Sequence, residues 1–310
     1  MVGKGLGNGF AHTFSIVARC HETGQLGVAV QSHWFSVGSI VIWAEAGVGA
    51  VATQAMIEMS YGPLGLALMR AGKSPAETLS ALTSVDNEHE LRQVAMVDRR
   101  GRVAVHTGPR CVADAGHEVG EGFSVQANMM INREVWPAMV TAYRSNKGDL
   151  TERLLAALEA GQAAGGDARG QQSAAILVVA AESTGRPWVD RLVDLRVEDH
   201  TEPISELRRL VEIGRVYKYM NKGDALLAEG NVEGALEAYR RSAEMEPEID
   251  EFPFWHAVTL ADLGRVEEAL PIFQKVFLAN PNWKVIAQRL PASGMLRDDP
   301  EMMQRILAAA

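Results

Sequence analysis

The pattern of hydrophobic and polar positions divides the chain into a strand-rich part and a helical part. Residues 13–20 and 25–32 are two apolar runs joined by His-Glu-Thr-Gly, which predicts a hairpin with a tight turn. Further strands are predicted at residues 39–45, 48–53, 91–98, 102–107, 122–127, 173–182 and 188–197. Several of these strands are apolar at consecutive positions, which indicates that both faces of their sheets are covered.

Helical segments separate these strands into groups. Helices are predicted at residues 55–70, 134–144 and 149–162. Another helix begins with Ser74-Pro75-Ala76-Glu77, a capping box in which the two outer side chains each accept a hydrogen bond from the other's backbone amide. The order of strands, two helices, strands, two helices and strands favours the α/β (α+β) class, with two stacked sheets between helical layers.

From Pro203 onward the pattern is helical, and it repeats with a period of 34 residues. The recurring pairs are Gly230 and Gly264, Ala235 and Ala269, Tyr239 and Phe273, and Pro247 and Pro281. Small residues where two helices touch, an aromatic residue on the second helix and a closing proline are typical of tetratricopeptide (TPR) repeats. We therefore expect a flexible leader at 1–12, a first domain at 13–202 and a TPR-like domain at 203–310.

The composition excludes several classes of protein. A hydrophobic content of 47% and a charged content of 22% are typical of soluble globular proteins, and no run approaches the ~18 apolar residues of a membrane helix. A net charge of −9 without a basic stripe argues against nucleic-acid binding. Cys20 and Cys111 have no metal or disulfide spacing and are expected to be buried, reduced thiols. No secretory signal is recognised, so we expect a cytoplasmic location.

Several short motifs of the first domain resemble those of one bacterial family. They are Thr-Phe-Ser-Ile-Val-Ala (13–18), Gly-Val-Ala-Val-Gln-Ser (27–32), Ala-Thr-Gln-Ala (52–55), Ser-Tyr-Gly (60–62), His-Thr-Gly (106–108), Ala-Gly-His (115–117), Gln-Ala-Asn-Met (126–129) and Ala-Gly-Gly-Asp-Ala-Arg-Gly-Gln-Gln-Ser (164–173). Over about residues 13–215 the chain resembles domain of unknown function 1028 (DUF1028). The resemblance implies a place among the N-terminal-nucleophile (Ntn) hydrolases, whose four-layer α/β/β/α sandwich agrees with the element order above.

This resemblance implies a catalytic role for Thr13. In an Ntn hydrolase the hydroxyl of the first residue attacks an amide, and its free α-amine, which titrates near pH ~7.7–8.0, takes up the proton. Thr13 follows His12, so cleavage between these two residues would be required; otherwise Thr13 is an ordinary residue at the start of a strand. Proteasome-type members also carry a lysine near the nucleophile, whereas this chain has none between Lys4 and Lys73.

Ser32, Gln54 and Asn128 are candidates to complete the catalytic site. Antiparallel pairing brings the open ends of the hairpin together, so Ser32 is expected near Thr13, either as a hydrogen-bonding group or as packing. Gln54 and the backbone amides of Thr53–Ala55 are expected where a strand leads into a helix N-terminus, which is suited to stabilising an oxyanion. Asn128 closes a predicted strand and would serve the oxyanion or satisfy turn backbone.

Substrate binding is expected at the glycine-rich loop of residues 163–172. Asp167 and Arg169 could hold the charged ends of a small zwitterion, or they could pair with each other and fix the loop. Gln171 and Gln172 in the same loop are further candidates for substrate contact. The loop lacks Gly-Lys-Ser/Thr and is not a nucleotide-binding P-loop.

Histidines provide the remaining candidates. His106 and His117 each lie near a glycine, and His106 is included among the expected substrate contacts, with loop hydrogen bonding as the alternative. The histidines lack the spacing of a zinc site, so we expect no metal, and no motif calls for a cofactor.

Three functions are compatible with these patterns. The first is an Ntn-type amidohydrolase acting on a small amide-containing metabolite, with the repeats serving dimerisation or docking. The second is a catalytically silent domain that binds a small metabolite, and the third is an adaptor that binds a protein through its repeats. The expected partners are a small-molecule substrate, a peptide or protein at the repeats, and a second copy of the chain in a homodimer.

Overall fold

The computed structural model describes residues 10–11 and 13–309. The chain divides into two compact units, the first ending at Leu210 and the second running from Val211 to the C-terminus. Of the expected leader at 1–12, residues 1–9 and 12 lie outside the described residues. Phe10–Ala11 form a short strand that pairs with the first unit, so this end of the leader is part of the sandwich described below.

Two antiparallel sheets form the centre of the first unit. Sheet A contains β1 (Phe10–Ala11), β4 (Ile42–Glu45), β5 (Gly49–Met56), β6 (Arg92–Asp98) and β7 (Val103–Thr107), with β1 and β4 both paired to β5. Sheet B follows the order β11 (Arg191–Val197), β10 (Ser173–Val179), β3 (Leu26–Ser32), β2 (Thr13–Arg19), β9 (Phe123–Ala127) and β8 (Gly116–Gly120). The mixed α/β class with antiparallel sheets is thus confirmed.

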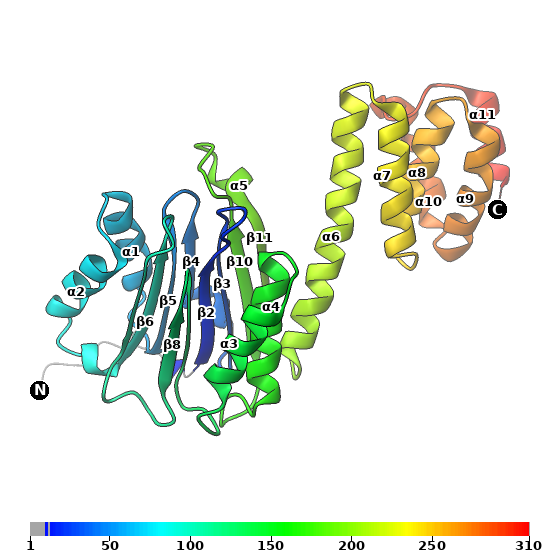
Figure 1. Ribbon diagram of the computed structural model, residues 1–310. Helices are drawn as coiled ribbons and strands as arrows, with labels where there is room; N and C mark the ends of the chain where they lie inside the picture. The colour runs from blue at the N-terminus through cyan, green and yellow to red at the C-terminus, as the bar shows by residue number, and fades with distance from the viewer. Residues whose placement is uncertain (1–9, 12, 310) are drawn as a thin grey trace, which may run out of the picture. The chain divides into compact units, whose positions relative to one another are not determined.

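Helices cover the outer face of each sheet. Helices α1 (Tyr61–Arg70) and α2 (Pro75–Val85) pack on sheet A, while α3 (Val135–Ser145) and α4 (Leu150–Ala163) pack on sheet B, which gives four layers (Figure 1). The strands are apolar on consecutive positions because both faces are covered. Between the sheets, Val17, Val28 and Val30 pack against residues of sheet A such as Ala52 and Ala95.

The hairpin predicted from residues 13–32 is present. β2 and β3 pair in antiparallel register with Thr13 opposite Ser32, and Gly24 in the connecting turn has a φ of +73°. Strand β10 extends the row, because Ser173 lies opposite Ser32 on its other side. Thr13, the first residue of β2, therefore lies in the middle of sheet B.

Other elements differ from the prediction at their ends. Strand β5 continues to Met56 and α1 begins only at Tyr61, so Thr53–Ala55 lie within a strand and not at a helix N-terminus. The positive φ of Ala55 (+70°) shows that the backbone bends here without becoming helical. Before β11 the chain forms a short helix, α5 (Pro187–Asp190), where a strand was expected. Within the described part of the first unit, 3-10 turns also occur at Val37–Ser39 and His89–Leu91.

The predicted capping box of α2 is confirmed. The Glu77 N–H donates to Ser74 Oγ at 3.3 Å, and the Ser74 N–H donates to Glu77 Oε2 at 2.7 Å. Pro75 occupies the first helical position, where no intrahelical N–H donor is needed. The two caps fix the start of the helix that covers β6 and β7.

The second unit is helical. Its elements are the C-terminal part of α6 (Pro203–Ala228), then α7 (Val232–Met245), α8 (Glu251–Asp262), α9 (Val266–Ala279), α10 (Asn282–Arg289), the 3-10 turn Pro291–Ser293 and α11 (Pro300–Ala308). Gly230 and Gly264 end equivalent helices with φ values of +79° and +83°. Ala269 and Phe273 are fully buried against Phe254, as the repeat pattern requires.

Candidate functional site

Thr13 opens β2, the strand of sheet B that lies between β3 and β9. Its side chain is fully buried, and its Oγ1 donates to Ser32 Oγ at 3.2 Å. Its carbonyl oxygen accepts the Asn128 N–H at 3.1 Å and the Gln54 Nε2 amide at 3.2 Å. The structure therefore brings the four residues considered catalytic, Thr13, Ser32, Gln54 and Asn128, into one buried cluster.

Two rows of polar side chains face each other beside this cluster, one from each sheet. Strand registers place Gln54, Gln93 and Thr107 side by side in sheet A, and Ser15, Gln126 and His117 side by side in sheet B. Residues directly opposite each other on neighbouring strands share a face of the sheet. The interior of the sandwich is thus polar at this end, while the hydrophobic cluster around Val28 fills its other part.

Hydrogen bonds join the two rows across the interior. The Ser15 hydroxyl donates to Gln54 Oε1 at 2.6 Å and accepts from Gln126 Nε2 at 2.6 Å. At the other end of the rows, Thr107 Oγ1 and His117 Nδ1 lie 2.8 Å apart. Because each of these contacts links one sheet to the other or one strand to its neighbour, the rows fix the relative position of the two sheets.

Gln93 is the centre of this network. Its Oε1 accepts from Gln54 Nε2 at 2.7 Å and from Asn128 Nδ2 at 2.9 Å. Its Nε2 donates to Thr107 Oγ1 at 2.9 Å and to the backbone carbonyls of Ala127 and Gly116 at 3.0 and 3.1 Å. One buried glutamine thereby orients both of the amides that hold the Thr13 carbonyl.

A fully hydrogen-bonded network of this kind is rigid, whereas an unpaired member would be costly. Two residues next to it have backbone conformations that are rare for residues other than glycine. Ala55 follows Gln54 with a φ of +70°, and Met129 follows Asn128 with a φ of +57°. Such strain is found preferentially at functional sites, where the surrounding structure holds it in place.

His117 has an electrostatic property that follows from its position. Burial, and to a smaller extent the nearby His106, lower the pKa of His117 below its usual value of 6.5. The unfolded chain therefore binds a proton first as the pH falls through 6.5, and this lowers the free energy of unfolding. At pH 7 the ring is neutral, and its Nδ1 can accept the proton of the Thr107 hydroxyl, whose oxygen already accepts from Gln93.

The glycine-rich loop is fixed by an internal ion pair. Asp167 is buried, and its carboxylate accepts from the Nε and Nη2 of Arg169 at 3.0 and 2.7 Å, as well as from the backbone N–H of Arg169 at 2.9 Å. The His33 N–H donates to the same carboxylate at 3.1 Å. Of the two alternatives for this pair, the structure shows the one in which the two side chains hold each other. Asp167 ties the loop to the end of β3, one residue beyond Ser32.

The other residues expected to bind substrate, Gln171, Gln172 and His106, lie at separate places. The Gln172 N–H donates to the Ser32 carbonyl at 3.1 Å, while its side chain donates to Asp199. The Gln171 carbonyl lies 3.4 Å from His33 Nδ1. His106 is not brought to the cluster: it lies opposite Val94 on the helix-covered face of sheet A, with its Nε2 2.7 Å from the His89 carbonyl oxygen.

Nothing in the described part of the chain gathers three or more histidine, cysteine or acidic side chains in a metal-binding arrangement. The same residues include no helix that is long and apolar enough to cross a membrane. Cys20 is buried and reduced, and burial raises the pKa of the Cys111 thiol to about 11, so Cys111 is protonated at neutral pH.

Fold and site together define a two-sheet α/β protein that continues into TPR-type helices. The chain belongs to the family of unknown function DUF1028, whose model matches residues 13–207, and a tetratricopeptide repeat model matches residues 219–249. The resemblance drawn from the motifs is thus confirmed. Among solved structures, the chain is similar to the crystal structure of protein SPO2555 from Silicibacter pomeroyi, assigned to DUF1028, at 32% identity and a TM-score of 0.59. The match covers 65% of this chain and 85% of that one. No curated protein matches the chain.

Sequence reasoning did not single out Gln93, Ser15, Gln126 or Thr107. A signal for them exists in the pattern, because each is a polar residue inside or at the end of an otherwise apolar strand whose faces are both covered. A buried glutamine in such a strand must find partners on a neighbouring strand or on the facing sheet. The pattern does not show which sheet face each glutamine occupies, or which residue is its partner there.

Proposed function

We propose that the first unit is an Ntn-type amidohydrolase whose nucleophile is Thr13. The observation that carries this proposal is the position of Thr13: it is the first residue of a central strand, its hydroxyl is hydrogen-bonded to Ser32, and its carbonyl is held by Asn128 and Gln54. Four layers of helix, sheet, sheet and helix around this residue, and membership of DUF1028, support the same assignment.

The proposed reaction needs a free α-amine on Thr13. The hydroxyl oxygen attacks the carbonyl carbon of the amide substrate, and the α-amine takes up the hydroxyl proton and then delivers it to the departing amine. Water hydrolyses the resulting ester and regenerates the hydroxyl. In the uncut chain, Ala11 pairs with Ala55 in sheet A while Thr13 pairs with Ser32 in sheet B, so these two residues on either side of His12 belong to different sheets.

The amides of Gln54 and Asn128 have positioning roles in this proposal. Each directs its side-chain N–H groups to Gln93 Oε1 and to the Thr13 carbonyl oxygen. They therefore hold the backbone of the nucleophile. Because these N–H groups already have acceptors, we assign stabilisation of the oxyanion to donors other than Gln54 and Asn128. Ser32 accepts from the Thr13 hydroxyl and fixes the direction of its oxygen.

The intact mass of the purified protein, measured before any activity assay, tests the proposal. We expect a species that begins at Thr13, and release of free amine from a panel of N-acyl amino acids and dipeptides. Thr13→Ala should abolish turnover without changing the melting temperature by more than a few degrees, and Thr13→Ser should retain part of the activity. Thr78→Ala is the matched control, since Thr78 is a buried threonine on the outer helix α2 and should leave turnover unchanged.

Two outcomes would contradict the proposal. One is an active enzyme whose mass shows that residues 1–12 are all retained. The other is turnover in Thr13→Ala that equals the activity of the Thr78→Ala control. A metabolite that raises the melting temperature of the wild type and of Thr13→Ala equally, without turnover, would favour the silent binding domain.

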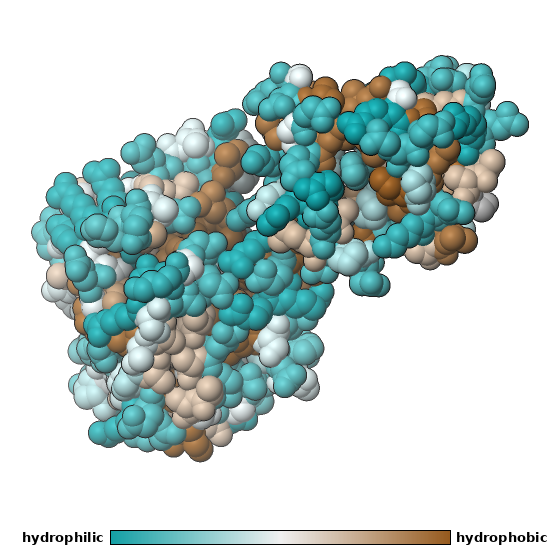
Figure 2. Space-filling view, turned by 45° about the vertical axis from the view of Figure 1, so that its right-hand side comes forward, coloured by the Kyte–Doolittle hydropathy of each residue, from teal (hydrophilic) through white to brown (hydrophobic). Residues whose placement is uncertain are grey.

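A second candidate function belongs to the helical unit, where a TPR model matches. A groove of about 540 Å³ there is lined mainly by apolar side chains, among them Leu227, Trp255 and Met295. Figure 2 shows apolar side chains exposed among charged ones over these helices. We propose that this groove binds a protein partner or a second copy of the chain. Trp255→Ala should reduce capture of the partner or the dimer fraction seen by light scattering, while Trp188→Ala, an exposed tryptophan of the first unit, should not.

A further inference from the structure

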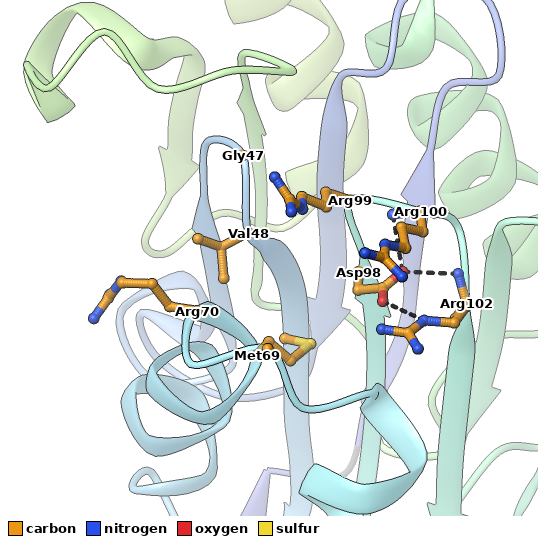
Figure 3. A pocket seen from close by; sticks show the side chains of 9 residues that line it. Gly47, Val48, Met69, Arg70, Asp98, Arg99, Arg100 and Arg102 are labelled. Atoms are coloured by element: carbon orange, nitrogen blue, oxygen red, sulfur yellow. Dashed lines mark hydrogen bonds and ion pairs between the residues drawn. The ribbon is translucent and has the colours of Figure 1, made fainter.

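A second pocket, unrelated to Thr13, lies where three connections of sheet A and its helices meet. Gly47 and Val48 of the β4–β5 turn, Met69 to Gly72 at the end of α1, and the β6–β7 turn at residues 98–102 surround a cavity of about 260 Å³ (Figure 3). Arg19, the last residue of β2, contacts the same turn, because its Nε donates to the Arg99 carbonyl at 2.8 Å. Since Thr13 is the first residue of that seven-residue strand, the pocket lies about 20 Å from Thr13.

The charges that line this pocket do not cancel. Its lining contains four arginines, Arg70, Arg99, Arg100 and Arg102, against the single carboxylate of Asp98. Arg102 Nε donates to Asp98 Oδ2 at 2.7 Å, and Arg70 is paired with Glu45 at the rim.

Two of the four guanidinium groups have no partner among the residues that the structure describes. Within residues 10–11 and 13–309, no acceptor or acidic group pairs with the guanidinium of Arg99 or Arg100. The pocket therefore carries about two uncompensated positive charges, although the protein as a whole has a net charge of −9.

The turn that presents these two arginines is held rigidly. Asp98 is almost completely buried, and its Oδ1 accepts the N–H groups of Arg100 and Arg102 at 3.0 and 2.9 Å. The Arg99 N–H donates to the Val48 carbonyl at 3.0 Å, which ties the turn to the other wall of the pocket. In Figure 3, Arg99 extends toward the Gly47 turn, while Arg70 points out to the opposite side. The backbone of the turn is fixed, and only the two side chains remain to be ordered by a ligand.

We propose that this pocket binds a small phosphate dianion, either inorganic phosphate or the terminal group of a phosphomonoester. Arginine binds such oxygens in bidentate fashion, and a phosphomonoester carries a charge of about −1.5 to −2 at pH 7, which matches two unpaired guanidinium groups. The cavity is smaller than the ~300–1,000 Å³ of pockets for drug-sized ligands, so it suits a phosphate group and not a whole nucleotide.

Calorimetric titration of the full-length protein with inorganic phosphate and with glycerol 2-phosphate tests this proposal. Saturable binding is expected for inorganic phosphate. A lower Kd for glycerol 2-phosphate than for inorganic phosphate would identify a phosphomonoester as the natural ligand. Arg99→Ala and Arg100→Ala should each weaken binding at least about tenfold, because hydrogen bonds to a charged group are lost. Arg100→Lys should lose less than Arg100→Ala. Arg186→Ala removes an exposed arginine elsewhere in the first unit and should leave the affinity unchanged.

The protonation of phosphate gives an independent check. A phosphomonoester has a second pKa of about 6, so the affinity for glycerol 2-phosphate should fall when the pH is lowered from about 7.5 to about 5.5. Sulfate remains a dianion over this range, and its binding should stay constant. The proposal is overturned if neither ligand binds with a Kd at or below about 1 mM. It is also overturned if binding survives the combined Arg99→Ala and Arg100→Ala substitution, or if the affinity for glycerol 2-phosphate does not respond to pH.

Discussion

Replacing Gln93 by leucine should weaken the first unit through its hydrogen bonds and not through its shape. Leucine is similar in size, but it cannot accept from Gln54 Nε2 or Asn128 Nδ2, which now donate to Gln93 Oε1 at 2.7 and 2.9 Å. It also cannot donate to Thr107 or to the two backbone carbonyls that Gln93 Nε2 reaches. Two buried amide N–H groups are then left without this acceptor.

The size of the effect follows from those two groups. Each unsatisfied buried donor costs about 1–3 kcal/mol, so the pair costs about 2–6 kcal/mol. The buried leucine and the removal of the Gln93 amide from the interior offset part of this cost. We expect a net loss of about 2–4 kcal/mol in the free energy of unfolding, which lowers the melting temperature of the first unit by roughly 5–15 °C.

Gln31 offers a matched control for this substitution. It is also a fully buried glutamine in a central strand of the same unit, but neither of its side-chain polar atoms has a hydrogen-bond partner within the described residues. It lies opposite Phe14 and Ala174, on the face covered by α4. Gln31→Leu should therefore cost nothing, or stabilise the unit by up to about 2 kcal/mol, because it removes an unpaired buried amide.

Differential scanning calorimetry on the full chain measures both variants. If Gln31→Leu lowered the melting temperature as much as Gln93→Leu, the loss would reflect the shape of the glutamine side chain, and the assigned network would be refuted. The same would follow if Gln93→Leu left the stability unchanged.

Three further substitutions test other parts of the fold. Asp86→Asn should cost up to about 3 kcal/mol, because the almost fully buried Arg92 loses its main partner. Burial raises the pKa of Asp86, but hydrogen bonds from Arg92 outweigh it and hold this pKa below 3.8. The difference from wild type, followed in pH-dependent urea unfolding, should therefore begin to shrink as the pH falls through 3.8 and vanish only below the lowered pKa of the folded state. Phe254→Ala should cost about 3–5 kcal/mol and shift only the calorimetric transition of the helical unit, since Phe254 is fully buried there. Ser74→Ala should lower the stability of the first unit by ~1 kcal/mol in urea unfolding through loss of the α2 cap, and no change would contradict the capping role.

The parts of this structure that were accessible from the sequence are local ones. The hairpin that begins at Thr13, the capping box at Ser74 and the repeat glycines at 230 and 264 each depend on residues close together in the chain. The pairing of Thr13 with Ser32 follows from the length of the two strands and their turn alone. Local patterns were therefore sufficient to predict the fold class and to place two catalytic candidates, Thr13 and Ser32, next to each other.

The polar rows depend instead on pairing between distant strands. His106 and His117 are equally plausible from the sequence, but the register decides between them. His106 lies opposite Val94 and faces the helices, whereas His117 lies opposite Gln126 on the inner face of sheet B, at its exposed edge strand. Likewise the helix expected from residue 55 begins only at Tyr61, because β5 continues along β6 and β1 up to Met56.

The two facing polar rows also constrain how the sheets can assemble while the chain folds. A strand that pairs one residue out of register turns all of its side chains to the opposite face. For β2, β5, β6 or β9 such a slip would move a serine or glutamine under the helices and leave its former partners unpaired in the interior. Each misregistered arrangement would therefore bury several unsatisfied amides at once. The same hydrogen bonds that surround Thr13 thus make the native register the only one in which this end of the sandwich can close without a large energetic cost.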